Sequence, residues 1–283
     1  MIDGSVAEIN QSASVEIVPL AGSLAVPAGA VHPIVPASPS APQLQPPAQV
    51  ERLQFSIRIS KNNAFNRWVA QNLGGQSGPA DGALLYLEQS GRVVKADQWV
   101  AGSVTQLDLP ALDSGSAAPI DPSVTVSATP VATAANLLSM RINSGGGIRA
   151  ASATSQFRVS PRSPIDLSRA VQVSALRLSA QNHGGTVSIV LPRDASMDAA
   201  LKAVHNAATA RTGLGIPPES SNLSIELLSP NLKNVYATVV LQNCIITGVD
   251  IPKAESNSAR LLERITVTYA YTDASIDFAW GWQ

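Results

Sequence analysis

Three histidines, one cysteine and a few neighbouring carboxylates are the residues of this 283-residue chain best suited to catalysis or metal binding. The histidines, His32, His183 and His205, are far apart in the sequence. No His-Glu-x-x-His, Cys-x-x-Cys, Gly-x-Ser-x-Gly or Walker motif brings such groups together. His205 falls on a predicted helix, where a partly buried or surface histidine is a simpler interpretation than a ligand or base. We therefore predict no catalytic residue, no cofactor and no metal site.

Two further patterns have the form of a site but a simpler explanation. Asp273 and Asp277 would suit acid/base work as a pair, yet near a predicted turn we expect them to be solvated. Gly213, Leu214 and Gly215 resemble part of a phosphate loop, but the following Pro217-Pro218 would interrupt the helix that such a loop requires. Neither pattern indicates an enzyme.

The single cysteine excludes an intramolecular disulfide. Cys244 lies in the apolar run LQNCIITGV, where a buried structural thiol is expected rather than a reactive one.

Composition and charge narrow the class of protein. Charged residues make up only 14% of the chain, against about 25% in typical soluble domains. The net charge of −1 gives no electrostatic argument for nucleic-acid binding. Few charges among many Ala, Ser and Thr residues suggest that much of the surface is covered in an assembly.

No apolar run reaches the roughly 18 residues that a membrane helix needs, so we expect no membrane segment. The first residues carry acids where a signal peptide needs positive charge. Assembly in the cytoplasm is therefore expected.

The C-terminal stretch, residues 261–283, has the clearest strand pattern. Large apolar residues alternate with small or polar ones on both sides of Thr272-Asp273, which has turn chemistry. We predict a hairpin whose buried face carries Ile265, Val267, Tyr269, Ile276, Phe278 and Trp280. This aromatic-rich end must dock in its own core or on a neighbouring subunit.

At the other end, residues 1–50 are predicted to form a proline-rich arm. Residues 17–50 contain eight prolines and no Asp, Glu, Lys or Arg, a composition that favours extended polyproline structure. A mobile tail and an ordered arm between subunits both remain open.

Two folded units are predicted after the arm, over residues 51–181 and 182–283. Each contains a strand, a helix ended by glycines, and further strands. In the first unit the helix is expected from Ser60 to Leu73. Residues 113–168 are rich in Ser, Ala, Thr and Pro and are interpreted as an insertion with two short strands. In the second unit the helix begins near residue 194, with one apolar stripe formed by Met197, Ala200, Leu201, Val204, Ala207 and Ala208.

The two units contain segments of equal length that align without a gap, Val93–Pro110 and Val235–Pro252. Their matched positions are Val93/Val235, Trp99/Leu241, Val104/Ile246, Thr105/Thr247, Leu107/Val249, Asp108/Asp250, Leu109/Ile251 and Pro110/Pro252. The shared ending, an apolar residue followed by Asp, an apolar residue and Pro, favours an internal duplication over chance.

The second unit resembles the tube-forming subunits of contractile phage tails and of type VI and extracellular injection systems. The similarity comprises the helix around Asp198–Thr209, the segment NLSIELLSPNLKNVYATVVLQNCIITGVDIP, and ERITVTYAYTDASIDFAW. The first unit resembles the same family through AFNRWVAQNLGG and QWVAG. The resemblance implies a mainly β protein of two tandem tube-like β-sandwich or barrel domains with one helix each.

The resemblance further implies a structural subunit that assembles into stacked rings around a lumen, in a virion tail or an injection-system particle. Tube rings of this family are six-fold, so a trimer with two domains per chain and a plain hexamer both remain open. Expected partners are other tail, sheath or baseplate proteins, with DNA or an effector passing through the lumen. The candidate subunit interface consists of the C-terminal aromatic residues Tyr269, Tyr271, Phe278, Trp280 and Trp282.

Alternative functions remain open. One is a baseplate or hub-adaptor protein. A second is a β-sandwich binding module that stacks ligands on Trp280 and Trp282. A third is a hydrolase with a site in residues 113–168.

Overall fold

A computed structural model of the chain describes residues 5–7, 15–17, 50–57, 64–88, 90, 92–141, 153–161, 165–214, 219–251 and 264–278. Most of the predicted arm, His32, Trp280 and Trp282 lie outside these residues. The fold is mainly β, which confirms the predicted fold class.

The elements of the N-terminal half are β1 (Ser5–Ala7), β2 (Val15–Ile17), β3 (Glu51–Ser56), α1 (Ala64–Leu73), β4 (Ala80–Leu87), β5 (Val93–Leu109), β6 (Leu112–Asp113), β7 (Ser123–Val131) and α2 (Ala135–Leu138). Those of the C-terminal half are β8 (Phe157–Ser160), the 3-10 turn η1 (Leu167–Arg169), β9 (Gln172–Val173), β10 (Leu176–Ser179), β11 (Gly185–Pro192), α3 (Ala195–Gly213), β12 (Ser221–Leu228), β13 (Val235–Asp250), β14 (Arg264–Tyr271) and β15 (Asp273–Phe278).

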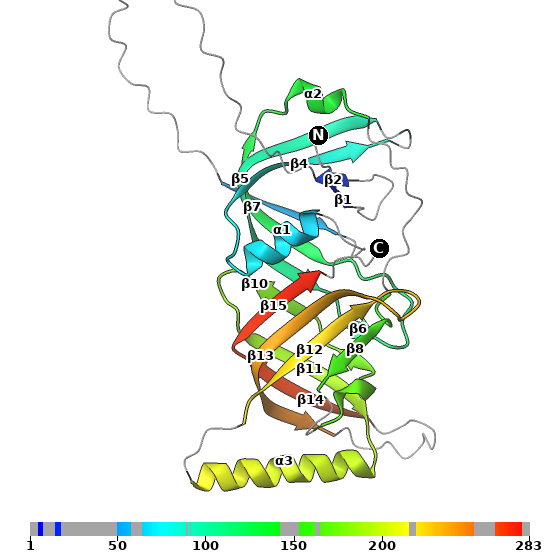
Figure 1. Cartoon of the computed structure of the whole chain (residues 1–283), viewed down its shortest axis with the longest axis vertical. Coiled ribbons are helices and arrows are strands. Elements are labelled where there is room, and N and C mark those ends of the chain that lie inside the picture. The colour runs from blue at the N-terminus through cyan, green and yellow to red at the C-terminus, as the bar shows by residue number, and fades with distance from the viewer. Residues whose placement is uncertain are drawn as a thin grey trace, which may run out of the picture.

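The strands form two antiparallel sheets that follow each other along the long axis of the molecule, as Figure 1 shows. The first has the order β1-β2-β4-β5-β7-β3, with β10 added to β5. The second has the order β6-β9-β11-β14-β13-β12-β8, with β15 added to β13. The helix α3 crosses the far end of the second sheet (Figure 1).

Alternating apolar residues make one face of each strand. In β14, Ile265, Val267 and Tyr269 are buried while the residues between them are partly exposed, as the period-2 pattern predicted. Side chains from both sheets belong to one continuous hydrophobic core. The two units are therefore packed together and do not form independent cores.

The segment predicted as an insertion contains β7, a strand integral to the first sheet. β7 lies between β5 and β3 and pairs with both. Its buried residues, Val124, Val126 and Ala128, are small and alternate with Ser and Thr. Because these residue types are also common in loops, composition concealed the strand.

The boundary between the predicted units is also more interleaved than residues 51–181 and 182–283 suggest. β8 pairs with β12, and β9 pairs with β11, so both belong to the second sheet although they precede residue 182. β10, which lies between β9 and β11 in the chain, pairs with β5 of the first sheet.

The prediction of a C-terminal hairpin is wrong. β14 and β15 do not pair with each other; both pair with β13, at Ile245–Asp250 and Ala237–Gln242 respectively. The pair is one strand bent at Thr272, because the long partner β13 itself bends and follows both halves. The turn chemistry at this position therefore marks a bend and not a reversal.

Candidate assembly interface

The hairpins β4-β5 and β12-β13 are two copies of one structure. Adding 142 to a residue number of β5 gives its equivalent in β13, which is the ungapped alignment predicted from the sequence. Both hairpins have irregularities at the same two places. The equivalent pairs are Ala80↔Gly102 and Ser221↔Cys244, Gly82↔Trp99 and Leu223↔Leu241, and Leu87↔Val93 and Leu228↔Val235.

A left-handed residue bends each long strand at the same point. Ala101 has φ 52° and its equivalent Asn243 has φ 53°, a region that L-residues seldom adopt. Each backbone N–H at the bend donates to a side-chain oxygen at the start of the partner strand. Ala101 donates to Asp81 Oδ1 at 2.9 Å, and Asn243 donates to Asn222 Oδ1 at 3.1 Å. Both long strands thus share the positive φ and the hydrogen bond that accompanies it, which supports a true duplication.

The two hairpins fill equivalent core positions with side chains of different size. In the first, the indole of Trp99 lies over two glycines. A Cβ at either Gly82 or Gly102 would come within 2.4 Å of the Trp99 ring. In the second hairpin the equivalents of Trp99, Gly82 and Gly102 are Leu241, Leu223 and Cys244.

The repeat includes the flanking strands. β7 and the bent pair β14-β15 cover the long strands at equivalent positions, and β3 and β11 follow them at the next position in each sheet. β2 and β8 pair with β4 and β12 at equivalent residues. We call the set β2-β3-α1-β4-β5-β7 the first repeat, and β8-β11-α3-β12-β13-β14-β15 the second repeat.

The repeats differ at the end of the long strand. In the first repeat β10 pairs with β5 at Gln106–Leu109, on the side away from β7. Within the described part of the chain, no strand pairs with the equivalent stretch of β13, from Gly248 onward, on the side away from β14. We call this stretch, Gly248–Ile251, the free edge.

Apolar side chains at this position are buried in the first repeat and exposed in the second. Leu107 and Leu109 are 0% and 5% exposed, since β10 and the second sheet cover them. Their equivalents Val249 and Ile251 are 42% and 44% exposed. The second repeat thus presents to solvent the surface with which the first repeat binds its successor.

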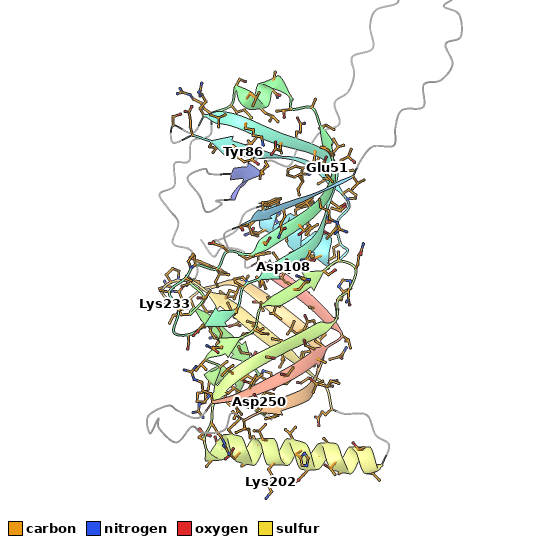
Figure 2. The ribbon with its side chains drawn as sticks, turned by 180° about the vertical axis from the view of Figure 1, so that it is seen from behind. Glu51, Tyr86, Asp108, Lys202, Lys233 and Asp250 are labelled. Atoms are coloured by element: carbon orange, nitrogen blue, oxygen red, sulfur yellow. The ribbon has the colours of Figure 1, made fainter. Side chains whose placement is uncertain are left out.

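The positions of two equivalent carboxylates illustrate this relation. In Figure 2, Asp108 lies in the middle of the molecule, where the two sheets meet, and Asp250 lies at the far end near α3. Asp108 Oδ1 accepts from Arg177 of β10 at 2.8 Å. Asp250 is exposed.

The helices of the two repeats differ in the same way. α1 contacts β5 of its own sheet and β15 of the second sheet, and it buries Phe65, Val69 and Leu73. On α3 the predicted stripe is only partly covered. Met197 is the one buried residue among those of α3 whose side chains the structure describes, and Ala207 and Ala208 are exposed.

The start of α3 is well defined. Asp194 Oδ1 accepts from the N–H of Met197 at 2.9 Å and from the Ser196 hydroxyl at 2.6 Å, an N-cap arrangement. The pKa of the Asp194 carboxyl lies below its usual value. The hydrogen bond from Ser196 contributes most to this shift, followed by the contact with Arg169 and the hydrogen bond from the Met197 N–H. The helix is therefore fixed at its first turn although most of its surface is uncovered.

A cavity of about 470 Å³ separates α3 from its sheet. Its walls include Val204 and Ala207 from α3 and Leu223, Cys244, Ile246 and Tyr269 from the sheet. In the first repeat the same face is filled by α1, whose Asn72 Oδ1 accepts from the Val104 N–H at 2.9 Å. At this face the second repeat therefore packs less completely than the first.

Burial disfavours the ionised forms of Cys244 and Tyr269, which line this cavity, and of Tyr271 on the same strand as Tyr269. Burial raises the pKa of the Cys244 thiol, which donates to the Leu241 carbonyl at 3.4 Å. Burial also raises the pKa of the Tyr269 and Tyr271 hydroxyls. These shifts disfavour the ionised thiol and phenol, and an uncharged thiol is a poor nucleophile.

The residues predicted as a subunit interface lie mainly inside the chain. Tyr269, Tyr271 and Phe278 are buried in its own hydrophobic core, and Trp280 and Trp282 lie outside the described residues. Sequence reasoning missed Val249 and Ile251 as interface candidates. The alignment with Leu107 and Leu109 contained the necessary signal, but burial of the first pair is visible only in the structure.

The candidate chemical groups that the structure describes do not converge on a site. His183 lies 3.5 Å from Asp273, and both are partly exposed. His205 is on the exposed side of α3. In the part of the chain that the structure describes, no cluster of three or more His, Cys, Asp or Glu residues is suited to hold a metal. None of the described helices has the length and apolarity to cross a membrane.

Comparison with known proteins gives little further information. No protein-family model and no curated protein matches the chain. One similar solved structure is the cryo-EM structure of the anti-feeding prophage cap, the tube-terminating cap, with 11% sequence identity and a TM-score of 0.35. The match covers 44% of this chain and 89% of the cap chain. A likeness of this size assigns neither a family nor a function.

Proposed function

We propose that the chain is a structural subunit that assembles head to tail, the second repeat of one copy binding the first repeat of the next. The observation that carries the proposal is the contrast between Leu107 with Leu109, buried between repeats, and Val249 with Ile251, exposed at the equivalent place. A contact of one repeat's surface with a different surface of the next is heterologous, so it extends until the chain of copies closes.

Exposed strand edges support the same conclusion. A strand end with exposed backbone donors and acceptors is a site for pairing with another chain, and closure of a ring removes it. The low charge of the sequence, 14% of residues, agrees with a protein much of whose surface becomes interface.

The kind of assembly comes from the sequence resemblance. We infer a ring of the tube of a contractile phage tail or injection system, located in the particle and assembled in the host cytoplasm. If the ring has six tube-like repeats, three chains supply them. A terminal or baseplate position, such as a tube cap or hub adaptor, suits a chain with two unlike repeats as well as a repeating tube position does. We infer no enzymatic activity.

The mass of the assembled particle tests the proposal. Purified protein at increasing concentration should form closed particles, visible by negative-stain microscopy as rings. Native mass spectrometry should give about 88 kDa, three times the chain mass of 29.4 kDa, for the trimer and about twice that for a hexamer. A chain that stays monomeric at high concentration refutes head-to-tail assembly.

A further inference from the structure

We propose that residues 42–45 of one copy form a strand on the free edge of β13 in the next copy, as β10 does on β5 within one chain. This inference rests on the proposed head-to-tail assembly and specifies the segment that makes its contact.

The segment between β8 and β11 shows how the repeats are joined. It begins on β8, which pairs with β12 of its own repeat, and it ends at β11, also of its own repeat. Between them it crosses to the first repeat, where Leu176–Ser179 pair with Gln106–Leu109 as β10. A connecting segment of one repeat thus completes the sheet of the preceding repeat.

The first repeat has the same connection at both ends. β2 pairs with β4 as β8 pairs with β12: Ile17 lies opposite Leu84, and Val159 lies opposite the equivalent residue Ile225. β3 then occupies the place of β11. The segment from residue 18 to residue 50 therefore corresponds to the one that contains β10.

The strand registers fix which residues of this segment correspond to β10. Phe55 lies opposite Val124, and Ile189 lies opposite the equivalent Val267, so positions in the two segments differ by 134. Five residues lie between the end of β10 and the start of β11, and five lie between position 45 and the start of β3. Leu178, which is buried opposite Leu107, corresponds to Leu44, which would lie opposite Val249.

The composition of residues 42–45, Pro-Gln-Leu-Gln, suits this role. The segment carries no charge, and its single large apolar residue, Leu44, falls at the position that faces the exposed Val249. Pro42 falls at the first position of the strand, where a missing N–H is tolerated.

Geometry favours a second copy over the same chain. Five residues separate position 45 from β3, a reach of about 20 Å at full extension. Figure 2 places Glu51, the first residue of β3, in the half of the molecule away from Asp250, which lies at the opposite end. The repeat that precedes β3 in a head-to-tail assembly is the second repeat of a neighbour.

Disulfide cross-linking between two singly substituted chains tests this pairing. Leu44→Cys and Val249→Cys are each made in full-length protein carrying Cys244→Ala, then purified separately, mixed, assembled and oxidised. Residues directly opposite in an antiparallel pair have Cβ atoms about 4.5–5.5 Å apart, near the spacing of a disulfide. A cross-linked species of two chains should form in most contacts, and it can arise only between copies.

The matched control replaces Val249→Cys by Asp250→Cys. Successive residues of a strand point to opposite faces, so this neighbouring cysteine should cross-link at least fivefold less. Rings that form without the Leu44–Val249 cross-link, or with equal cross-linking at position 250, overturn the pairing and leave the proposed function standing. A doubly substituted chain that cross-links to itself at high dilution also overturns it. Absence of any assembly by the unsubstituted protein overturns the proposed function itself.

Discussion

Replacement of Val249 by aspartate is the most direct test of the free edge as an assembly surface. Val249 and Ile251 are 42% and 44% exposed in the single chain. Full burial of such a side chain is worth roughly 1.5–3 kcal/mol. Covering the remaining two fifths should therefore contribute about 0.6–1.3 kcal/mol per residue to each contact between copies.

Val249→Asp loses this contribution and also places a carboxylate in a surface that becomes dry on assembly, which costs at least as much again. A total of at least about 1.2–2.6 kcal/mol per contact weakens association roughly 7- to 70-fold or more, since 1.4 kcal/mol corresponds to a factor of ten. Sedimentation velocity over a concentration series should show the variant as single chains where the natural protein is assembled. The free energy of unfolding of the single chain should change little, because the side chain is already largely exposed.

Leu232→Asp is the matched control. Leu232 is 59% exposed in the connection between β12 and β13, and Figure 2 places its neighbour Lys233 near the middle of the molecule, away from both of its ends. This variant should assemble as the natural protein does. Equal assembly by the Val249→Asp variant would refute the reasoning that equates the free edge with the β5 edge covered by β10.

Three further predictions concern the fold itself. Gly82→Ala should destabilise the chain by about 1–3 kcal/mol in urea unfolding through overpacking against Trp99. The loss should be smaller in a Trp99→Leu background, and a double variant whose loss equals the sum of the two single losses would contradict the packing argument. Deletion of residues 275–283 removes two buried side chains of β15 and should lower the free energy of unfolding by about 3–6 kcal/mol, whereas an equally stable truncated protein would show that β15 is dispensable. The pKa of Asp194 is lowered in the folded state, so its carboxylate stabilises the fold above about pH 4 and does so less as pH falls. The difference in free energy of unfolding between the natural protein and Asp194→Asn should therefore narrow from about pH 4 to pH 2, and a constant difference over this range would exclude the carboxylate charge as its cause.

The sequence was sufficient where one strand face is apolar and large. Alternation identified β14, and the ungapped match of two long segments indicated the duplication of the long strands β5 and β13. It failed where the buried face is made of small residues, as in β7, because Val and Ala between Ser, Thr and Pro resemble a loop. It also failed at Thr272, because a bend and a turn use the same residue types, and only the strand pairing distinguishes them.

The candidate interface could likewise be predicted from the sequence only in part. Large aromatic residues near the C-terminus suggested a docking surface, but Tyr269 and Phe278 are used inside the chain. The exposed pair Val249 and Ile251 looks like ordinary strand sequence. Its significance depends on comparison with an equivalent strand whose edge is covered, and this comparison requires pairing registers that a single sequence does not contain.

The different side-chain sizes at equivalent core positions of the two hairpins have a consequence for strand pairing. The first hairpin has Trp99 over two glycines, and the second has Leu241 with Leu223 and Cys244. If a hairpin strand of one repeat were exchanged for its counterpart from the other, an indole would meet Leu or Cys side chains, or a leucine would leave a hole above two glycines. The two repeats thus share a backbone structure, but a strand of one cannot replace its equivalent in the other. A domain swap that exchanges the same strand between two copies creates no such mismatch. A strand placed in the other repeat does, so packing alone distinguishes the two repeats when strands pair.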